Sequence, residues 1–382
     1  MIIILGLILP IAIWLWLLCF RGLFWRCDEQ LENELLGIES PSICTVIPAR
    51  NEADLLPVTM RSLLNQTYSG TLNIVLVDDC STDGTAKVAR EIADGLGKLQ
   101  HLHIVSAASL PSGWTGKLWA MHQGIEKAES FAPDYILLTD ADIEHDKDNL
   151  QRLVSKVVQQ DLDMASVMVR LRCESFWEKF LIPAFVFFFQ KLYPFRWVNN
   201  PGNPTAAAAG GCILIRREVL EEIGGIQVVR QALIDDCALA AAVKSKERKI
   251  WLGLSNLTCS LRPYPSLETI WSMVARTAFT QLNYSPLLLV GTLLGMIVIY
   301  VVLPVGFLLG AVLGSWWVVI VGLFGWLLMT VCYLPTIRFY RCSFWYAFCL
   351  PAVAFLYTLM TFDSALRHWQ GRGGAWKGRV YP

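Results

Sequence analysis

Three pairs of aspartates have a spacing that could support chemistry. They are Asp78 and Asp79, Asp140 and Asp142, and Asp235 and Asp236. Two carboxylates that alternate along the chain can face one hard cation, which prefers oxygen ligands and often keeps water and phosphate in its shell. A single aspartate can also accept a proton as a general base. Each pair taken singly also fits a solvated turn or the cap of a following helix.

The predicted strands place two of these pairs at strand ends. The apolar run Leu72–Val77 ends directly in Asp78, and Tyr135–Thr139 ends directly in Asp140. A further strand is predicted over Ile43–Ile47, which Pro48 follows. The carboxyl ends of strands are where ligands bind in open α/β sheets. The aspartates therefore stand where a ligand is expected.

Helices are predicted between these strands, over Ala53–Leu64 and Thr85–Leu96. Strands that alternate with helices, with polar residues at the strand ends, indicate an α/β fold. The predicted architecture is a mostly parallel, doubly wound (Rossmann-like) sheet in a soluble domain.

The composition is that of a membrane protein with a large soluble part. Of 382 residues, 54% are hydrophobic and only 17% are charged, whereas soluble proteins carry about 25% charged residues. The 32 basic and 32 acidic residues balance, so nothing indicates a nucleic-acid partner. Aromatic residues make up 12% of the chain, which excludes a disordered protein.

Apolar segments at both ends of the sequence predict membrane spans. They cover Ile2–Phe20, Leu287–Leu309, Ser315–Leu334 and Phe344–Phe362. No basic residue precedes the first segment and no small-residue cleavage site follows it, which favours a retained anchor over a signal peptide. The predicted organisation is an anchor over 1–21, a soluble domain over 40–283, transmembrane helices over 285–363 and a basic tail over 364–382.

The basic residues predict the orientation of the chain. Arg21 and Arg26 flank the first span, so the positive-inside rule places the soluble domain in the cytoplasm, on a multi-pass protein of the inner (plasma) membrane. Arg338 and Arg341 also favour the inside, as does the basic tail, although a single predicted span separates them. Two resolutions stay open: a re-entrant segment around Pro351, or a tail that ends outside.

The 11 cysteines show no CxxC spacing or repeated framework. In a cytoplasmic domain they are expected to be buried and reduced. No zinc site is predicted.

Four ordered motifs resemble those of the family 2 glycosyltransferases. They are IPARNE (Ile47–Glu52), VDDCSTDGT (Val77–Thr85), TDAD (Thr139–Asp142) and IDDCAL (Ile234–Leu239). The resemblance covers about Ser42–Arg276. It implies a GT-A fold, a nucleotide-sugar donor and inversion at the anomeric carbon.

Three further stretches are similar to narrower branches of that family. They are Leu110–Gly124, Ala206–Leu220 and the tail motif WKGRVYP (Trp376–Pro382). The branches are the membrane glycosyltransferases associated with hopanoid synthesis and relatives that glycosylate carotenoid-type lipids.

The resemblance also implies roles for residues that bind the donor. Residues implied to hold the nucleoside half are Pro48, Arg50, Glu52, Asp78 and Asp79. Lys117 would approach the diphosphate, unless it is an ordinary surface lysine. Asp140 and Asp142 would coordinate Mg²⁺ or Mn²⁺ that bridges the diphosphate.

The same resemblance implies that Asp236 is the base that takes the acceptor proton. Asp235 stands where the family commonly has Glu. The alternative is that Asp235 is the base and Asp236 caps the following helix. Gly210 and Gly211 would let backbone approach the sugar or acceptor closely, or they form a plain turn before a strand.

One departure argues against a processive polymer synthase. Such family members carry QxxRW after the base, and the corresponding stretch Met273–Thr277 keeps only Arg276. Arg276 would reach the diphosphate, or it is a structural arginine at the membrane surface.

The segment 176–197 suggests how a lipid acceptor enters. Its apolar block Phe180–Phe189 is too short to span a bilayer and is flanked by charged residues, which is typical of an interfacial helix. A buried core helix is the alternative. The preferred function is transfer of a sugar to a membrane lipid, a hopanoid or another polyisoprenoid. The alternatives are transfer to polyprenyl phosphate, and a catalytically silent glycosyltransferase-like module.

Overall fold

The computed structural model describes residues 2–31, 40–373, 375–376 and 379–380. The chain forms two compact units. The sheet unit comprises Glu29–Arg172 and Trp197–Pro263. The helical unit comprises Met1–Asp28, Cys173–Arg196 and Tyr264–Pro382. The predicted soluble domain, 40–283, was wider than the sheet unit, because the segments 173–196 and 264–283 pack with the apolar helices instead.

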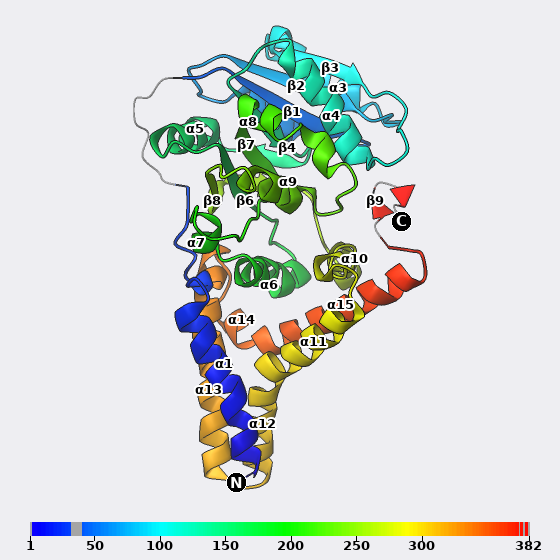
Figure 1. Cartoon of the computed structure of the whole chain (residues 1–382). Coiled ribbons are helices and arrows are strands. Elements are labelled where there is room, and N and C mark those ends of the chain that lie inside the picture. The colour runs from blue at the N-terminus through cyan, green and yellow to red at the C-terminus, as the bar shows by residue number, and fades with distance from the viewer. Residues whose placement is uncertain (1, 32–39, 374, 377–378, 381–382) are drawn as a thin grey trace. The chain divides into compact units, whose positions relative to one another are not determined.

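The sheet unit is built on one sheet of eight strands in the order β3-β2-β1-β4-β7-β6-β8-β5 (Figure 1). The strands are β1 (Ile43–Ala49), β2 (Leu72–Asp78), β3 (Leu102–Ser106), β4 (Tyr135–Thr139), β5 (Ile143–His145), β6 (Met164–Arg170), β7 (Cys212–Arg216) and β8 (Ile250–Ser260).

The sheet is mixed but mostly parallel. Neighbours β3, β2, β1 and β4 all run parallel, as do β6 and β8. Strand β7 runs antiparallel to both β4 and β6, and β5 runs antiparallel to β8. The first three predicted strands correspond to β1, β2 and β4. The strand expected after Gly211 corresponds to β7. Its antiparallel direction was not predicted, because that direction depends on the long segment that precedes it.

The sheet core is apolar on both faces. Every residue of β1 and of β4 is buried, which is typical of a central strand covered by helices on both sides. The helices of this unit are α2 (Leu56–Leu64), α3 (Thr85–Gly95), α4 (Gly116–Glu129), α5 (Asn149–Gln159), α8 (Arg217–Glu222) and α9 (Asp235–Lys244). The division of the chain between Arg196 and Trp197 falls within the short helix α7 (Phe195–Val198).

Two helices among the described residues of the helical unit are long and apolar enough to cross a membrane. The first, Pro286–Val312, is α11 (Pro286–Met296) continued through a π-helical turn, Ile297–Val301, into α12 (Val302–Val312). The second is α13 (Trp316–Phe339). They coincide with the predicted spans 287–309 and 315–334.

The other two predicted spans are not among these spanning helices. Residues Ile2–Phe20 form helix α1, which packs against α12 and α13 (Figure 1). The predicted span 344–362 is not one continuous apolar helix, because it divides into α14 (Trp345–Phe348) and α15 (Leu350–Trp369). Helix α15 continues beyond that span through Asp363 and Arg367, so within the described residues it does not qualify as a spanning helix.

Helix α6 (Phe176–Leu192) covers the segment for which two interpretations were open. A capping box at Ser175 starts it, because Ser175 accepts from the backbone of Glu178 and Glu178 accepts from the backbone of Ser175. One side of α6 is buried, with Phe187 fully covered, whereas Phe176 is 59% exposed. Helix α6 therefore has one buried side and one exposed side. It packs against α10 (Leu267–Ala275), α13 and α15.

The predicted basic tail, 364–382, is helical as far as Trp369. Two short strands, β9 (Ala375–Trp376) and β10 (Arg379–Val380), then pair antiparallel. Residues 374, 377–378 and 381–382, which include parts of the WKGRVYP motif, lie outside the described residues.

Candidate active site

The register of the sheet brings the predicted site residues to one edge. Ala49 at the end of β1 is opposite Asp78 at the end of β2, and β4 runs parallel to β1 beside it. The segments that follow these three strands therefore emerge together. Because β7 is antiparallel to β4, Thr139 lies opposite Cys212. This pairing places Gly210 and Gly211, which precede β7, beside the end of β4.

Lys117 lies between Asp140, which follows β4, and Asp235, which begins α9. Its Nζ atom lies 3.0 Å from Oδ1 of Asp140 and 3.3 Å from Oδ2 of Asp235. Lys117 sits in the first turn of α4, where Thr115 accepts from the backbone of Leu118 as the N-cap. Burial lowers the pKa of Lys117, but the neighbouring carboxylates outweigh it and raise that pKa above its usual range. Lys117 is thus a charged group within the site, not a surface lysine.

Asp236 is held by two backbone N–H groups at the start of α9. Its Oδ2 accepts from the backbone of Gly210 at 2.8 Å, and its Oδ1 accepts from Cys237 at 2.8 Å. Burial and the nearby Asp235 carboxylate raise the pKa of Asp236 to about 6, although Lys117 opposes this. Burial also raises the pKa of Asp140, with Asp142 adding to the shift and Lys117 opposing it.

Arg262 is a site residue that the sequence analysis missed. Its Nε donates to Oδ2 of Asp142 and its Nη2 donates to Oε1 of Glu52, both at 2.7 Å. Arg262 follows β8, and β8 pairs with β5 so that Ser260 lies opposite Ile143. The nearest available signal was a lone arginine two residues after a strand, which by itself carries no functional meaning.

The remaining donor-side residues form a connected turn network. Nη1 of Arg50 donates to the backbone carbonyl of Asp79 at 2.9 Å and lies 3.6 Å from its Oδ2. Oδ1 of Asp78 accepts from the backbone N–H of Ser81 at 3.0 Å. Asp78 therefore stabilises the turn after β2, which is one of the two roles considered for it. Asp79 is buried, with 2% of its surface exposed. Pro48 lies within β1, one residue before its last position.

The two glycines differ in what surrounds them. A Cβ on Gly211 would come within 2.8 Å of Cγ1 of Val169, and the Gly211 carbonyl accepts from the Thr139 hydroxyl at 2.7 Å. A Cβ on Gly210 would lie 3.4 Å from Nζ of Lys117 and 3.5 Å from Oδ2 of Asp236. Gly210 therefore borders the charged groups, while Gly211 packs into the sheet.

This geometry does not establish two of the predicted features, the role of Arg276 and the metal site. Arg276 forms the C-cap of α10 and belongs to the helical unit, whereas the other predicted site residues belong to the sheet unit. Its role at the diphosphate stays a prediction. Within the described residues, no group of three or more His, Cys, Asp or Glu side chains is arranged to hold a metal ion.

Comparison with known proteins relates part of the chain to a known family. Residues 44–224 match the model of glycosyl transferase family 2. A 4,4'-diaponeurosporenoate glycosyltransferase of Staphylococcus aureus is 25% identical over 227 residues, 59% of this chain and 57% of that protein. An uncharacterised protein of Methanocaldococcus jannaschii is 31% identical over 137 residues, 36% of this chain and 50% of that protein. The chain thus spans little more than half the length of these relatives.

Among solved structures, the mannosyltransferase of Pyrobaculum calidifontis in complex with GDP-Man and Mn²⁺ shares the fold. It superposes with a TM-score of 0.57 at 17% identity, covering 96% of this chain and 99% of that one. Residues 44–224, just under half of the chain, thus match the glycosyl transferase family 2 model, and the fold is α/β and GT-A-like.

Proposed function

We propose that the protein is an inverting glycosyltransferase that moves a sugar from a nucleotide-sugar to a membrane lipid. The observation that carries this proposal is the arrangement around Asp236. A partly buried carboxylate whose pKa is raised to about 6 is oriented by two N–H donors. It follows Asp235, which ion-pairs with Lys117, and the same lysine ion-pairs with the strand-end carboxylate Asp140.

Asp236 is the proposed general base. Its carboxylate accepts the proton of the acceptor hydroxyl while that oxygen attacks the anomeric carbon from the face opposite the leaving group. The bond between the anomeric carbon and the phosphate oxygen breaks, and the nucleoside diphosphate departs with inversion. A base works best when its pKa is close to the working pH, and a pKa of about 6 meets this condition. Asp235, which ion-pairs with Lys117, is the less favoured base.

The donor-side residues are proposed to bind the nucleoside. Arg50 is held against Asp79, and Arg262 holds Glu52. Carboxylates that accept hydrogen bonds from a base or ribose give selectivity, because an unpaired buried donor costs about 1–3 kcal/mol. Pro48 and Asp78 are proposed to shape this end of the site. Arg276 is proposed to meet the diphosphate.

The residues present fit a divalent cation, Mg²⁺ or Mn²⁺. Asp140 and Asp142 supply oxygen ligands, and such ions commonly bind proteins through one or two carboxylates together with substrate phosphates. Burial and the nearby Asp142 carboxylate raise the pKa of Asp140. A bound cation would oppose this shift, because it stabilises the ionised carboxylate. When bound, the metal neutralises charge on the departing diphosphate. The Mn²⁺ in the complex of the Pyrobaculum calidifontis enzyme supports manganese for a first assay.

A lipid acceptor is supported by the two helices that are long and apolar enough to cross a membrane. The name of the Staphylococcus aureus relative, a 4,4'-diaponeurosporenoate glycosyltransferase, also indicates a carotenoid-derived acceptor for that protein. We favour a hopanoid or another polyisoprenoid, at the cytoplasmic face of the inner membrane. Polyprenyl phosphate is the alternative acceptor. A catalytically silent module is the alternative from another class of protein.

The test is release of nucleoside diphosphate by the purified full chain in detergent with Mn²⁺. A panel of nucleotide-sugars is offered with and without extracted membrane lipid, and Asp236→Asn is assayed beside the wild type. Lipid-dependent release that the variant lacks, with labelled product in the organic phase, supports the proposal. Failure to bind or consume any donor favours the silent module. Unchanged release by the variant removes Asp236 as the base.

A further inference from the structure

The short segment Ala209–Gly211 holds the carboxylate of the proposed base. The backbone N–H of Gly210 donates to Oδ2 of Asp236 at 2.8 Å. The other hydrogen bond to this carboxylate comes from Cys237, which is the next residue of α9. Among the described residues, Gly210 is therefore the donor from a different segment that fixes the direction of Asp236.

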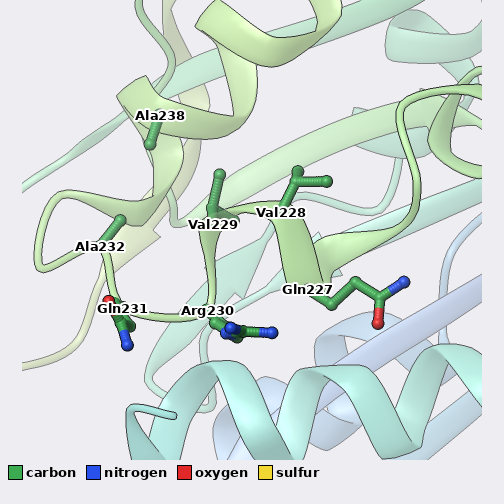
Figure 2. Close-up of a pocket in the computed structure, with 7 residues that line it drawn as sticks. All are labelled: Gln227, Val228, Val229, Arg230, Gln231, Ala232 and Ala238. Atoms are coloured by element: carbon green, nitrogen blue, oxygen red, sulfur yellow. The ribbon is translucent and has the colours of Figure 1, made fainter. Parts of the chain in front are cut away.

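The loop that precedes α9 supplies no such donor. Residues 227–232 and Ala238 line a pocket of about 540 Å³ at this loop (Figure 2). Within the described part of the chain, the hydrogen bonds to Asp236 come from Gly210 and Cys237 and from none of these lining residues. The orientation of Asp236 thus depends on what holds Ala209–Gly211.

Sheet pairing begins only after this segment. Strand β7 starts at Cys212, which lies opposite Thr139 of β4, and the next residue, Ile213, lies opposite Ser166 of β6. The peptide groups of Ala209–Gly211 precede these pairs. Because buried peptide groups need hydrogen-bond partners, the segment must be held by contacts other than the strand ladders.

Two fully buried hydroxyl groups supply these contacts. Oγ of Ser166 accepts from the backbone N–H of Ala209 at 2.8 Å and donates to the Ala209 carbonyl at 3.1 Å. On the other side of β7, the hydroxyl of Thr139 donates to the carbonyl of Gly211 at 2.7 Å. The exposed fractions of Ser166 and Thr139 are 0% and 1%, so both hydroxyls are shielded from water.

His145 orients the hydroxyl of Thr139. Its Nε2 lies 3.0 Å from Oγ1 of Thr139. Because the single hydroxyl proton is donated to Gly211, Nε2 must carry a proton and be the donor in this contact. Nδ1 then accepts from Nδ2 of Asn149 at 3.2 Å. Burial lowers the pKa of His145 to about 4, which keeps the ring neutral and this donor arrangement unchanged at neutral pH.

The Ser166 contact fixes the peptide group that meets Asp236. The carbonyl of Ala209 and the N–H of Gly210 belong to one planar trans peptide unit, so they point in opposite directions. The Ala209 carbonyl also accepts from the backbone of Cys212, at a longer distance of 3.4 Å. A carbonyl held by Ser166 therefore directs the Gly210 N–H toward Asp236.

We infer that Ser166 and Thr139 are positioning residues for the proposed base, Asp236. The inference rests on the proposed function, which assigns Asp236 as the base. The two hydroxyls hold Ala209–Gly211 from both sides and act on the carboxylate through the N–H of Gly210. Removing either hydroxyl is expected to lower turnover, because the carboxylate then loses its fixed direction.

Two substitutions with matched controls test the inference in the purified full chain. Ser166→Ala is paired with Ser155→Ala, because the Ser155 hydroxyl is also buried and donates to the carbonyl of Gln151 within α5. Thr139→Val is paired with Thr45→Val, because Thr45 is buried on β1 and its hydroxyl has no hydrogen-bond partner among the described residues. Thr139→Ser keeps the hydroxyl and is expected to restore turnover.

We expect kcat at saturating donor to fall about tenfold in Ser166→Ala and in Thr139→Val, and to stay at the wild-type value in the two controls. Binding of UDP and GDP with Mn²⁺ is expected to be unchanged in Ser166→Ala, because β6 does not pair with β4, the strand that leads to Asp140. Wild-type kcat in both variants, or weaker nucleotide binding that accounts for the whole loss, overturns the inference.

A double variant separates positioning from a general structural effect. When Asp236 is already replaced by Asn, Ser166→Ala is expected to lower kcat no further, because the group that it positions is gone. A further fall of about tenfold in that background would show that Ser166 acts independently of Asp236, and the inference would be wrong.

Hydrogen exchange of the Gly210 amide tests the positioning without any turnover. We expect exchange to be about tenfold faster in Ser166→Ala than in the wild type or in Ser155→Ala. Equal exchange in all three proteins overturns the inference. If exchange depends on Ser166 but no nucleotide-sugar is ever consumed, the positioning of the carboxylate stands and the proposed function fails. The Ser166 pair decides alone if Thr139→Val does not fold.

Discussion

The ammonium group of Lys117 lies 3.0 Å from Oδ1 of Asp140. One residue is in the first turn of α4, and the other directly follows β4. The same ammonium lies 3.3 Å from Asp235, so one cation holds together the acidic motif proposed for the donor and the one proposed for the acceptor. Changes at Lys117 are therefore expected to affect both halves of the reaction.

Replacing Asp236 with Asn is expected to lower turnover by about 10²- to 10⁴-fold while nucleotide binding is kept, because only the base is removed.

A raised carboxyl pKa at Asp236 means that the folded state binds the proton more tightly than the unfolded state does. The ionised group thus disfavours folding once the pH exceeds its unfolded pKa, and Asp236→Asn should raise the unfolding temperature at pH 8 but not at pH 4. Kinetics, nucleotide titration and thermal unfolding measure these effects.

Asp235→Asn is the control for that experiment. If it abolishes turnover while Asp236→Asn stays active, the roles of the two aspartates are reversed.

The pH profile of turnover should follow the ionisation of Asp236. Burial and Asp235 raise its pKa to about 6, so below that pH the protonated carboxyl cannot accept the acceptor proton. We expect kcat to rise about tenfold per pH unit below pH 6 and to level off above it. The measurement is kcat from pH 5 to 8.5 with saturating donor and Mn²⁺. A flat profile would show that this ionisation does not govern the step.

Replacing Lys117 with Met removes the shared cation and leaves a side chain of similar length. Lys117 lowers the pKa of Asp236, so the midpoint of the pH profile should move upward. The neighbouring carboxylates raise the pKa of Lys117. Lys117 therefore stabilises the folded state at every pH below the pKa of a lysine in the unfolded chain, provided that these carboxylates are ionised. We expect a loss of about 1–3 kcal/mol at pH 8 and less at pH 5.

Thermal unfolding at the two pH values checks the Lys117 prediction. An equal loss at both values would indicate that Lys117 acts through packing alone.

Replacing Arg262 with Ala removes the cation shared by Glu52 and Asp142. Both carboxylates then lose a fixed partner, and a negatively charged donor meets a more negative site. We expect nucleotide affinity in the presence of Mn²⁺ to fall about tenfold, with partial rescue by Arg262→Lys. Isothermal titration measures it, with Arg248→Ala as the control. Unchanged affinity in Arg262→Ala would limit Arg262 to a structural role.

The two adjacent glycines should respond differently to alanine. A Cβ on Gly211 would meet Val169 at 2.8 Å inside the sheet, so Gly211→Ala should lower the free energy of unfolding by about 1–3 kcal/mol. The nearest atoms to a Cβ on Gly210 are Nζ of Lys117 and Oδ2 of Asp236, so Gly210→Ala should fold normally and lower turnover. Unfolding and rate measurements on both variants distinguish the two effects, and the opposite assignment contradicts the geometry.

Local patterns of residues were enough to predict the secondary-structure elements and the polar groups at their ends. Strand runs such as Leu72–Val77 are short and apolar, and their boundaries are marked by the polar residues that follow. Strands alternating with helices then predicted parallel pairing of β1, β2 and β4, and hence one edge where the aspartates gather. The two apolar helices were equally visible, because their length and composition are local properties.

Which distant residues share the site depends on the pairing and packing of segments that are far apart in the chain. The direction of β7 places Gly210 beside Asp236, and the pairing of β5 with β8 accompanies the approach of Arg262 to Asp142. Neither contact leaves a local pattern, because each depends on pairing between segments far apart in the chain. The grouping of 173–196 with the apolar helices has the same origin. An apolar helix fits a core or an interface equally well until its neighbours are known.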